Sequence, residues 1–278
     1  MGARTGNEYL ENLRRCQPEV WLAGQRVHDV TTEPAFAGTL RSIMEQYDLQ
    51  HDPRHRDIAI TDGYSSGFVI PRTKEDLVRR RQLYKLRTDH SFGFMGRAPD
   101  FMNAILTDFS LISALFATGG SEAYGDNIVA YYEHIRDNDL FLTHMLVNPQ
   151  VDRSRTSAQQ EDPFTHLGRV RHTSKGIVVR GAKMLGTMAP LCEEVMAWPF
   201  GGIPAGDEPT PSGSVSRPTP RGCGSSAARS SPLRGAVVSI TPCRRGSRRW
   251  TASQSSTTCW SLGIGCSSTG AEQRRATW

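Results

Sequence analysis

Two side chains in this sequence have surroundings in which they could act on a ligand. Arg97 stands in GRAPDF, after a glycine and before a helix start expected at Pro99. A guanidinium fixed there could stabilise an anion, although such an arginine more often lies on the surface. His144 lies in the apolar stretch FLTHMLV, where imidazole could accept a proton but is more often a hydrogen-bonded core residue.

Three further polar positions carry weaker signals. His51 and His55 have a spacing that could bind metal on a helix, but Asp52-Pro53 separates them and predicts a loop, so no metal site is expected. The stretch NPQVDRS after His144 could simply cap its own loop. Gly186 would let the backbone before Thr187 approach a ligand, and a strand-end turn explains the pair as well.

The elements that must position these residues change in character near residue 140. Thr5 is expected to cap a helix through Tyr9 and Leu13, and VWLAGQRVHDV reads as strand, turn and strand. YDLQHDPRHRDI is expected to be a polar loop. Apolar residues at helical spacing predict helices over 34–47, over 71–95 with Thr73 as the cap, over 99–118 and over 127–137.

The residues after Asp139 favour strands. FLTHMLVNPQVD is apolar and extended, HLGRVRHTSKGIVVRGAKML predicts two strands around a Ser-Lys-Gly turn, and VMAWPF predicts another. The sequence therefore predicts an α+β chain, with a helical domain over 1–140 and part of a β domain over 141–208.

The last 70 residues have a different composition. Residues 1–208 carry 23 Lys+Arg and 27 Asp+Glu, whereas residues 209–278 carry ten Arg, no Lys and one acid. The overall charge of +5 therefore comes from the tail, which also holds 15 Ser and shows no sustained period of 2 or 3.6. Taken alone, the tail could be a disordered Ser/Arg-rich segment or a basic nucleic-acid arm.

Cysteine usage and hydropathy suggest a cytoplasmic protein. Cys16 and Cys192 are isolated in the leading part, and none of the six cysteines has a spacing typical of zinc. The sequence contains no apolar run long enough to span a membrane and no signal-peptide pattern after Met1.

The leading part resembles the oxygenase component of the 4-hydroxyphenylacetate 3-monooxygenase family. The resemblance spans about residues 4–208 and is carried, in the family's order and spacing, by RTGNEYLENLR, DVTTEPAF, YDLQHDPRHRD, IPRTKEDLVRRR, FGFMGRAPDFMNA, NDLFLTHMLVNPQVDRS and GIVVRGAKMLGTMAP. It implies an acyl-CoA dehydrogenase-like fold, with a helical domain, a β-barrel-like domain and a C-terminal helical bundle. It also implies ortho-hydroxylation of a phenol with O2 and with reduced FAD from a separate flavin reductase.

The same resemblance implies roles for individual residues. Arg97 and His144 would orient and deprotonate the phenol, and Phe101 would contact it where the family often has tyrosine. The FAD-binding residues implied are His144, Gln150, Val151, Asp152, Arg153 and Thr187. FGFMGRAPDFMNA has no cysteine, unlike the related dehydratases that bind an iron–sulfur cluster near this segment, and the family needs no metal here.

The resemblance also accounts for the tail. Back-translated with GC-rich codons and read one base upstream, residues 211–229 and 240–270 can encode peptides like those the family carries next. A frameshift near Glu208–Pro209 is therefore expected, leaving 209–278 disordered and this chain truncated and inactive. The full-length form is expected to be a homodimer or homotetramer. Two alternatives remain: a non-catalytic or nucleic-acid-associated protein with a basic tail, and a flavoenzyme of the same fold acting on an acyl-CoA.

Overall fold

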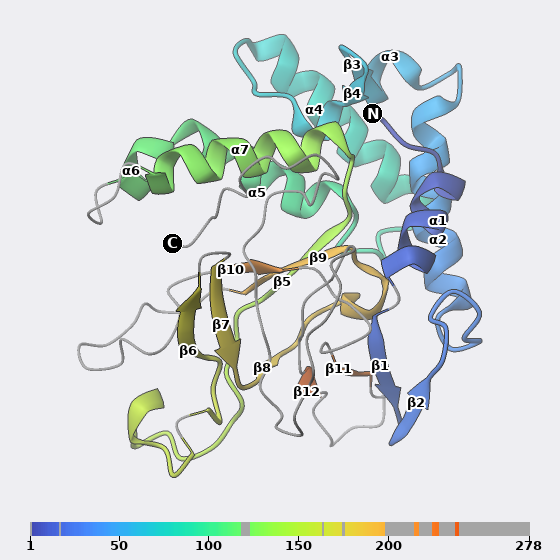
Figure 1. Ribbon diagram of the computed structural model, residues 1–278. Helices are drawn as coiled ribbons and strands as arrows, with labels where there is room; N and C mark the ends of the chain where they lie inside the picture. The colour runs from blue at the N-terminus through green and yellow to red at the C-terminus, as the bar shows by residue number, and fades with distance from the viewer. Residues whose placement is uncertain are drawn as a thin grey trace. The chain divides into compact units, whose positions relative to one another are not determined.

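A computed structural model describes residues 2–16, 18–117, 123–162, 164–173 and 176–197, together with three short later strands (Figure 1). The chain divides into two compact units. The helical unit comprises Met1–Arg15 and Thr31–Leu142, and the β unit comprises Cys16–Val30 and Thr143–Trp278. As the sequence predicts, helices predominate up to Asp137 and strands from Leu142 onward, with short strands among the helices at 19–27 and 60–65.

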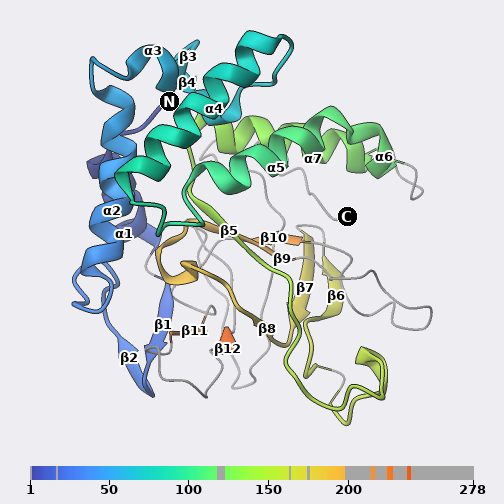
Figure 2. The ribbon, with the colours of Figure 1, turned by 180° about the vertical axis from the view of Figure 1, so that it is seen from behind.

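The helical unit is built mainly from helices joined by short connections. In both views α5 and α7 lie side by side (Figures 1 and 2). Its elements, with α1 reaching one residue into the next unit, are α1 (Gly6–Cys16), α2 (Ala37–Asp48), the 3-10 turn η1 (Leu49–His51), α3 (Arg56–Ala59), β3 (Ile60–Thr61), β4 (Tyr64–Ser65), the 3-10 turn η2 (Ser66–Phe68), α4 (Lys74–His90), α5 (Asp100–Leu111), α6 (Ser113–Ala117) and α7 (Ala123–Asp137).

Two helices begin at the caps that the sequence predicts. At α1 the amide of Glu8 donates to Thr5 Oγ1 at 3.3 Å, while Glu8 Oε2 accepts from the amide of Thr5 at 2.8 Å. At α4 the amide of Asp76 donates to Thr73 Oγ1 at 3.1 Å, and the Asp76 carboxylate accepts from the amide of Thr73 at 2.9 Å. Each capping box satisfies amides that the first helical turn would otherwise leave unpaired.

Helix α4 ends earlier than the periodicity predicts, at His90 rather than Met95. The amide of Gly93 donates to Thr88 O at 2.9 Å and that of Phe92 donates to Asp89 O at 3.1 Å. Both residues have positive φ, 50° for Phe92 and 75° for Gly93. This is the pattern of a Schellman motif, which closes a helix and turns the chain away from its axis.

Two other predictions need correction. The helix expected over 99–118 is interrupted at Ile112, whose φ of −104° and ψ of 25° end α5 before α6 begins. The stretch expected as a polar loop, YDLQHDPRHRDI, contains the helical turns η1 and α3. Segments of three or four helical residues are too short to show a hydrophobic period.

The N-terminus of the helical unit is anchored on Asp139, two residues after the end of α7. The amide of Arg4 donates to Asp139 Oδ2 at 3.0 Å, and Gln50 Nε2 donates to the same oxygen at 3.0 Å. The hydroxyl of Tyr47 donates to Asp139 O at 3.1 Å, and the ring of Tyr47 stacks on Tyr9 with centroids 5.2 Å apart. This buried network fixes the end of α7 immediately before the chain enters β5.

The β unit consists of small open sheets in its described part. One has the order β2-β1-β11-β12-β8, another the order β10-β9-β5, and β6 and β7 form a hairpin. The elements are β1 (Glu19–Leu22), β2 (Gln25–Val27), β5 (Leu142–Met145), the 3-10 turn η3 (Ser157–Gln159), β6 (Gly168–Thr173), β7 (Gly176–Arg180), β8 (Lys183–Met184), the 3-10 turn η4 (Ala189–Leu191), β9 (Glu194–Ala197), β10 (Ser214–Ser216), β11 (Gly224–Ala227) and β12 (Val237–Val238).

Most of the tail falls outside the described residues. Beyond residue 208 only the strands β10, β11 and β12 are described, so the disorder expected over 209–278 stays a prediction. Across the described parts of the chain, none of the helices is both long and apolar enough to cross a bilayer.

Candidate functional site

Arg97 and Phe101 lie against each other where the loop after α4 enters α5. The guanidinium carbon of Arg97 is 4.2 Å from the ring centroid of Phe101, a cation–π distance. Nη1 of Arg97 donates to Gly96 O at 3.0 Å, whereas its buried Nε has no hydrogen-bond partner within the described residues. The structure thus holds a half-buried cation that retains donors for an anionic ligand.

The start of α5, between Arg97 and Phe101, is held by buried charge. Asp100 Oδ1 lies 3.9 Å from Nη1 of Arg87, an α4 residue that is only 1% exposed. Nη2 of Arg87 lies 3.5 Å from Ser65 Oγ. Burial raises the pKa of Asp100 above its usual value, and the charge of Arg87 opposes that rise. The pair joins α4 to the segment that carries Arg97.

The same seam between α4 and α5 contains polar groups that the described residues leave unsatisfied. Asn103 is fully buried, and neither Oδ1 nor Nδ2 finds a partner among the described residues. The buried hydroxyl of Tyr84 also has no hydrogen-bond partner among the described residues, and burial raises the pKa of Tyr84 to about 12. Such atoms cost stability unless something pairs with them.

Thr187, a predicted site residue, is bonded to the strand that carries His144, through the neighbour of that histidine. Half-buried His144 is the third residue of β5, and the preceding Thr143 donates its hydroxyl to Thr187 O at 2.6 Å. Thr187 lies in an exposed turn and its own hydroxyl has no partner among the described residues. The bond from Thr143 thus ties the backbone of Thr187 to the strand that carries His144.

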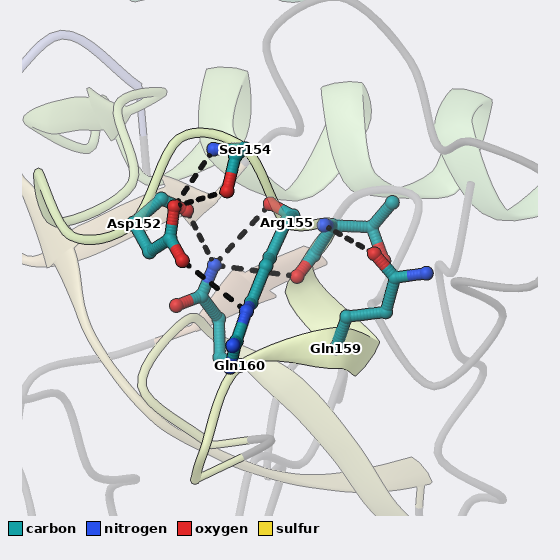
Figure 3. A network of polar contacts seen from close by, with 6 residues as sticks. Asp152, Ser154, Arg155, Gln159 and Gln160 are labelled. Atoms are coloured by element: carbon teal, nitrogen blue, oxygen red, sulfur yellow. Dashed lines mark hydrogen bonds and ion pairs between the residues drawn. The ribbon is translucent and has the colours of Figure 1, made fainter.

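The stretch from Gln150 to Arg153, predicted to contact FAD, is exposed. Figure 3 shows the polar contacts around Asp152. Asp152 Oδ1 accepts from the amide and hydroxyl of Ser154 at 2.9 and 2.6 Å, and Asp152 Oδ2 pairs with Arg155 Nε at 3.2 Å. The hydrogen bonds from Ser154 lower the pKa of Asp152. This carboxylate organises its own loop.

The neighbouring groups hold the ends of that loop. Gln160 Nε2 donates to Asp152 O at 2.8 Å and to Arg155 O at 3.2 Å, as Figure 3 shows. Arg153 donates to the side chain of Gln150, and Val151 is exposed. Self-capping thus accounts for the shape of this loop, and contact with FAD stays a prediction.

Lys183, at the start of β8, is a site feature that the sequence analysis missed. Its buried Nζ donates to Leu146 O at 3.1 Å, and burial lowers its pKa to about 8. Thr143 and Arg87 are likewise absent from the predicted site residues. Only Thr143 carries a sequence signal, as a polar residue in the run from Leu140 to Met145, which is otherwise apolar apart from one histidine. Arg87 lies in a polar helix and Lys183 between half-buried residues, so no local pattern marks them.

The described residues contain no group of three or more His, Cys, Asp or Glu side chains that could hold a metal ion. Of the predicted site residues, the structure brings together Arg97 with Phe101 and Gln150 with Arg153, and it bonds Thr187 to Thr143, the residue before His144. The first pair lies in the helical unit and the others lie in the β unit.

Comparison with known proteins links this arrangement to a group of oxygenases. The family model described as "4-hydroxyphenylacetate 3-hydroxylase N terminal" matches residues 5–210. The chain is 44% identical over 210 residues to the 4-hydroxyphenylacetate 3-monooxygenase oxygenase component of Thermus thermophilus, covering 74% of this chain and 42% of the relative. It is 34% identical to the oxygenase component of a Rhodococcus 4-nitrophenol 2-monooxygenase, covering 66% of this chain and 35% of the relative.

A solved structure of an oxygenase component is also similar to this chain in three dimensions. The oxygenase component of a 4-hydroxyphenylacetate 3-monooxygenase, complexed with FAD and 4-hydroxyphenylacetate, superposes with a TM-score of 0.75 at 37% identity. That match covers 86% of this chain and 53% of the other. The chain spans about two fifths of the length of the Thermus relative.

Proposed function

This chain belongs to the 4-hydroxyphenylacetate 3-hydroxylase family, and on that basis we propose that it derives from the oxygenase component of a two-component, FAD-dependent aromatic monooxygenase. In the full-length protein this enzyme hydroxylates a phenol ortho to its hydroxyl group. Its reduced FAD comes from a separate flavin reductase, and O2 is the second substrate. The full-length form is a homodimer or homotetramer that works in the cytoplasm.

The observation that carries the proposal is the state of Arg97. Its guanidinium stacks on Phe101, bonds only the neighbouring Gly96 O, and keeps its Nε unpaired within the described residues. A half-buried cation that has no carboxylate partner among the described residues can gain from a ligand that provides the opposite charge. A phenolate or a substrate carboxylate has the charge and shape that a guanidinium binds.

The residues of the β unit fit a non-covalently bound flavin. The hydroxyl of Thr187 is exposed and unpaired among the described residues, and Gly186 precedes it. Hydroxyl groups and backbone amides of this kind can pair with the polar edge of an isoalloxazine ring. We propose that Thr187, His144 and the stretch Gln150–Arg153 hold FAD, which when bound and reduced supplies the activation of oxygen.

His144 and Arg97 would prepare the phenol. An imidazole nitrogen of His144 accepts the proton from the phenolic oxygen, which makes the ring more electron-rich at its ortho carbon. Arg97 stabilises the resulting negative charge or the carboxylate of the substrate. Phe101 packs against the guanidinium and contributes an apolar wall that helps to exclude water.

Phe101 bears on the choice of phenol. Phenylalanine provides the ring of a tyrosine without its hydroxyl donor, so a substrate that needs that hydrogen bond loses affinity. Relatives of this chain are named for 4-hydroxyphenylacetate and for 4-nitrophenol. We propose a para-substituted phenol as the substrate class, with less dependence on a polar group near position 101.

We propose that a frameshift after about residue 208 separates this chain from its ancestral sequence. The family match stops at residue 210, close to the change in charge and serine content at residue 209. The domains would then be residues 1–140 and 141–208, with 209–278 an out-of-frame tail. Phe92 and Phe94, 87% and 93% exposed, offer apolar surface of a kind that promotes association when left uncovered.

The test compares two proteins. The gene is resequenced across the codons for Asp207 to Ser216, and the frame is restored by one base to give a full-length form. Both products are supplied with reduced FAD, O2 and either 4-hydroxyphenylacetate or 4-nitrophenol, and catechol formation is followed by chromatography. We expect the restored form to hydroxylate at least one phenol and the 278-residue chain to be inactive.

Variants of the restored form then assign the residues. Replacing His144 with alanine is expected to lower kcat by about 100-fold or more, the usual range for a proton-transfer group. Arg97→Met is expected to raise KM for the anionic substrate more than it lowers kcat. A restored form that binds reduced FAD but forms no catechol from any phenol would contradict the proposed function, as would full activity of His144→Ala.

A further inference from the structure

We propose that Thr143 is a positioning residue whose hydroxyl fixes the Thr187 turn against the strand that carries His144. Thr143 is 2% exposed and donates Oγ1 to Thr187 O at 2.6 Å across 44 residues of sequence. The contact joins two elements of the same unit. Only the link to flavin affinity rests on the proposed function, whereas the coupling of strand and turn stands on geometry alone.

The turn that Thr143 reaches has a backbone that is unfavourable by itself. Leu185 and Met188, on either side of Gly186-Thr187, have φ of 63° and 62°. Side chains other than glycine rarely adopt this left-handed region, and such residues persist when neighbouring structure holds them. The amide of Thr187 donates to Leu185 O at 3.0 Å, a bond that stays within the turn. The hydroxyl of Thr143 adds a hydrogen bond from outside the turn.

Thr143 and Met145 meet the turn from the same side of β5. A Cβ atom placed on Gly186 would lie 3.0 Å from both Cγ and Sδ of Met145, so the turn packs closely on that side chain. Side chains two apart in a strand share a face, and the residue between them faces the other way. The contacts of Thr143 and Met145 thus determine the orientation of His144. If β5 shifted by one residue relative to the turn, His144 would face the turn instead of pointing away from it.

The residues after β5 are joined to β8 by a backbone bridge and by the side chain of Lys183. Val147 and Met184 form an antiparallel bridge, with the amide of Met184 donating to Val147 O at 2.7 Å. Lys183 Nζ donates to Leu146 O at 3.1 Å. The strand β8 ends at Met184. After it, the left-handed conformations of Leu185 and Met188 interrupt the extended backbone that strand pairing requires. Beyond this point the side-chain hydroxyl of Thr143, rather than a backbone amide, donates to the carbonyl of Thr187.

A matched pair of substitutions isolates the hydroxyl. Thr143→Val keeps the branched shape but leaves Thr187 O without its donor, and Thr143→Ser restores the donor without the methyl group. In the 278-residue chain, hydrogen exchange of the amides of Thr187, Ala189 and Leu191 is followed by mass spectrometry at micromolar concentration. We expect exchange about tenfold faster in Thr143→Val, as for loss of one buried hydrogen bond, and within about threefold of wild type in Thr143→Ser.

The control is the same chemical change in the other unit. Thr107→Val removes a buried hydroxyl that donates to Asn103 O at 2.7 Å within α5, and it is expected to leave exchange at the Thr187 turn unchanged. If Thr143→Val exchanges like wild type, or if Thr143→Ser exchanges as fast as Thr143→Val, the inference is overturned. Faster exchange confined to Thr143→Val supports it.

A second measurement connects the turn to the flavin. In the frame-restored protein, Thr143→Val is expected to raise the dissociation constant for reduced FAD about tenfold and to shift KM for the phenol less than that. Thr143→Ser should stay within about threefold of wild type. If the unsubstituted protein fails to bind FAD, the proposed function fails while the exchange result still decides the coupling. If it binds FAD and Thr143→Val binds equally well, the flavin part of the inference is wrong.

Discussion

The segment that carries Arg97 is held by buried charge, whereas the strand that carries His144 is held mainly by neutral hydrogen bonds. In the helical unit, Asp100 at the start of α5 lies 3.9 Å from the buried Arg87. In the β unit, Thr143 donates to a backbone carbonyl at 2.6 Å. Removing one partner of a buried ion pair strongly lowers the free energy of unfolding, because the other charge stays buried without a partner. A lost neutral bond has a smaller and more local effect.

The tryptophans allow the two units to be followed separately. All five, at positions 21, 198, 250, 260 and 278, fall within the ranges of the β unit. Tryptophan fluorescence therefore reports on the β unit through Trp21 and Trp198, because the other three lie in the tail that is expected to be disordered. Circular dichroism at 222 nm reports mainly on the helices. The following predictions compare how much charged groups and neutral hydrogen bonds contribute to the stability of each unit.

The largest effect is expected from Arg87→Met. The change leaves Asp100 buried without its cation, and the helical unit should lose about 3–5 kcal/mol of unfolding free energy. Urea titration followed by circular dichroism measures this loss. The double variant Arg87→Met with Asp100→Leu removes both charges and should recover most of it. A loss below about 1 kcal/mol in the single variant would show that the pair contributes little to holding α5.

Lys183 provides a charge-dependent effect in the β unit. Its pKa falls from 10.5 to about 8 on burial. Between those two pH values the unfolded chain binds more protons than the native one, so stability rises with pH across this window. Wild type should gain about 2–3 kcal/mol relative to Lys183→Met between pH 8 and 10.5. Urea titration followed by tryptophan fluorescence tests this, and a flat difference would contradict it.

A smaller effect of opposite sign is expected at Asn103. Both of its side-chain polar atoms are buried and unpaired within the described residues, so Asn103→Leu removes two unsatisfied groups while keeping the branching and the number of heavy atoms of the side chain. The helical unit should become about 1–2 kcal/mol more stable. Thermal unfolding at 222 nm measures the change. Destabilisation by a similar amount would mean that Asn103 has a partner that the described residues do not supply.

The smallest effect is expected at the surface cap of α4. Thr73→Ala removes the hydroxyl that accepts from the amide of Asp76, and it should cost about 1 kcal/mol in the helical unit. Thr73→Ser keeps the cap and serves as the matched control. Urea titration by circular dichroism compares the three proteins. A cost equal to that of Arg87→Met would mean that the end of α4, rather than buried charge, determines the stability of this unit.

Local sequence determined the starts of α1 and α4. The boxes at Thr5 and Thr73 use residues three apart, and the apolar period of α2 involves residues within one helix. Such interactions form within a few residues of chain, so they can be read without knowing the fold. The contact of Arg97 with Phe101 is local in the same sense, since the residues are four apart.

The tertiary structure decided where helices stop and which distant groups meet. Phe92 closes α4 in a left-handed conformation usually taken by glycine, and no local preference predicts that choice. Ser65 meets Arg87, and Thr143 meets Thr187, only after elements far apart in the sequence have packed. Hydrogen bonds of this kind depend on the relative position of whole elements, which the sum of long-range packing sets and which no short stretch of sequence contains.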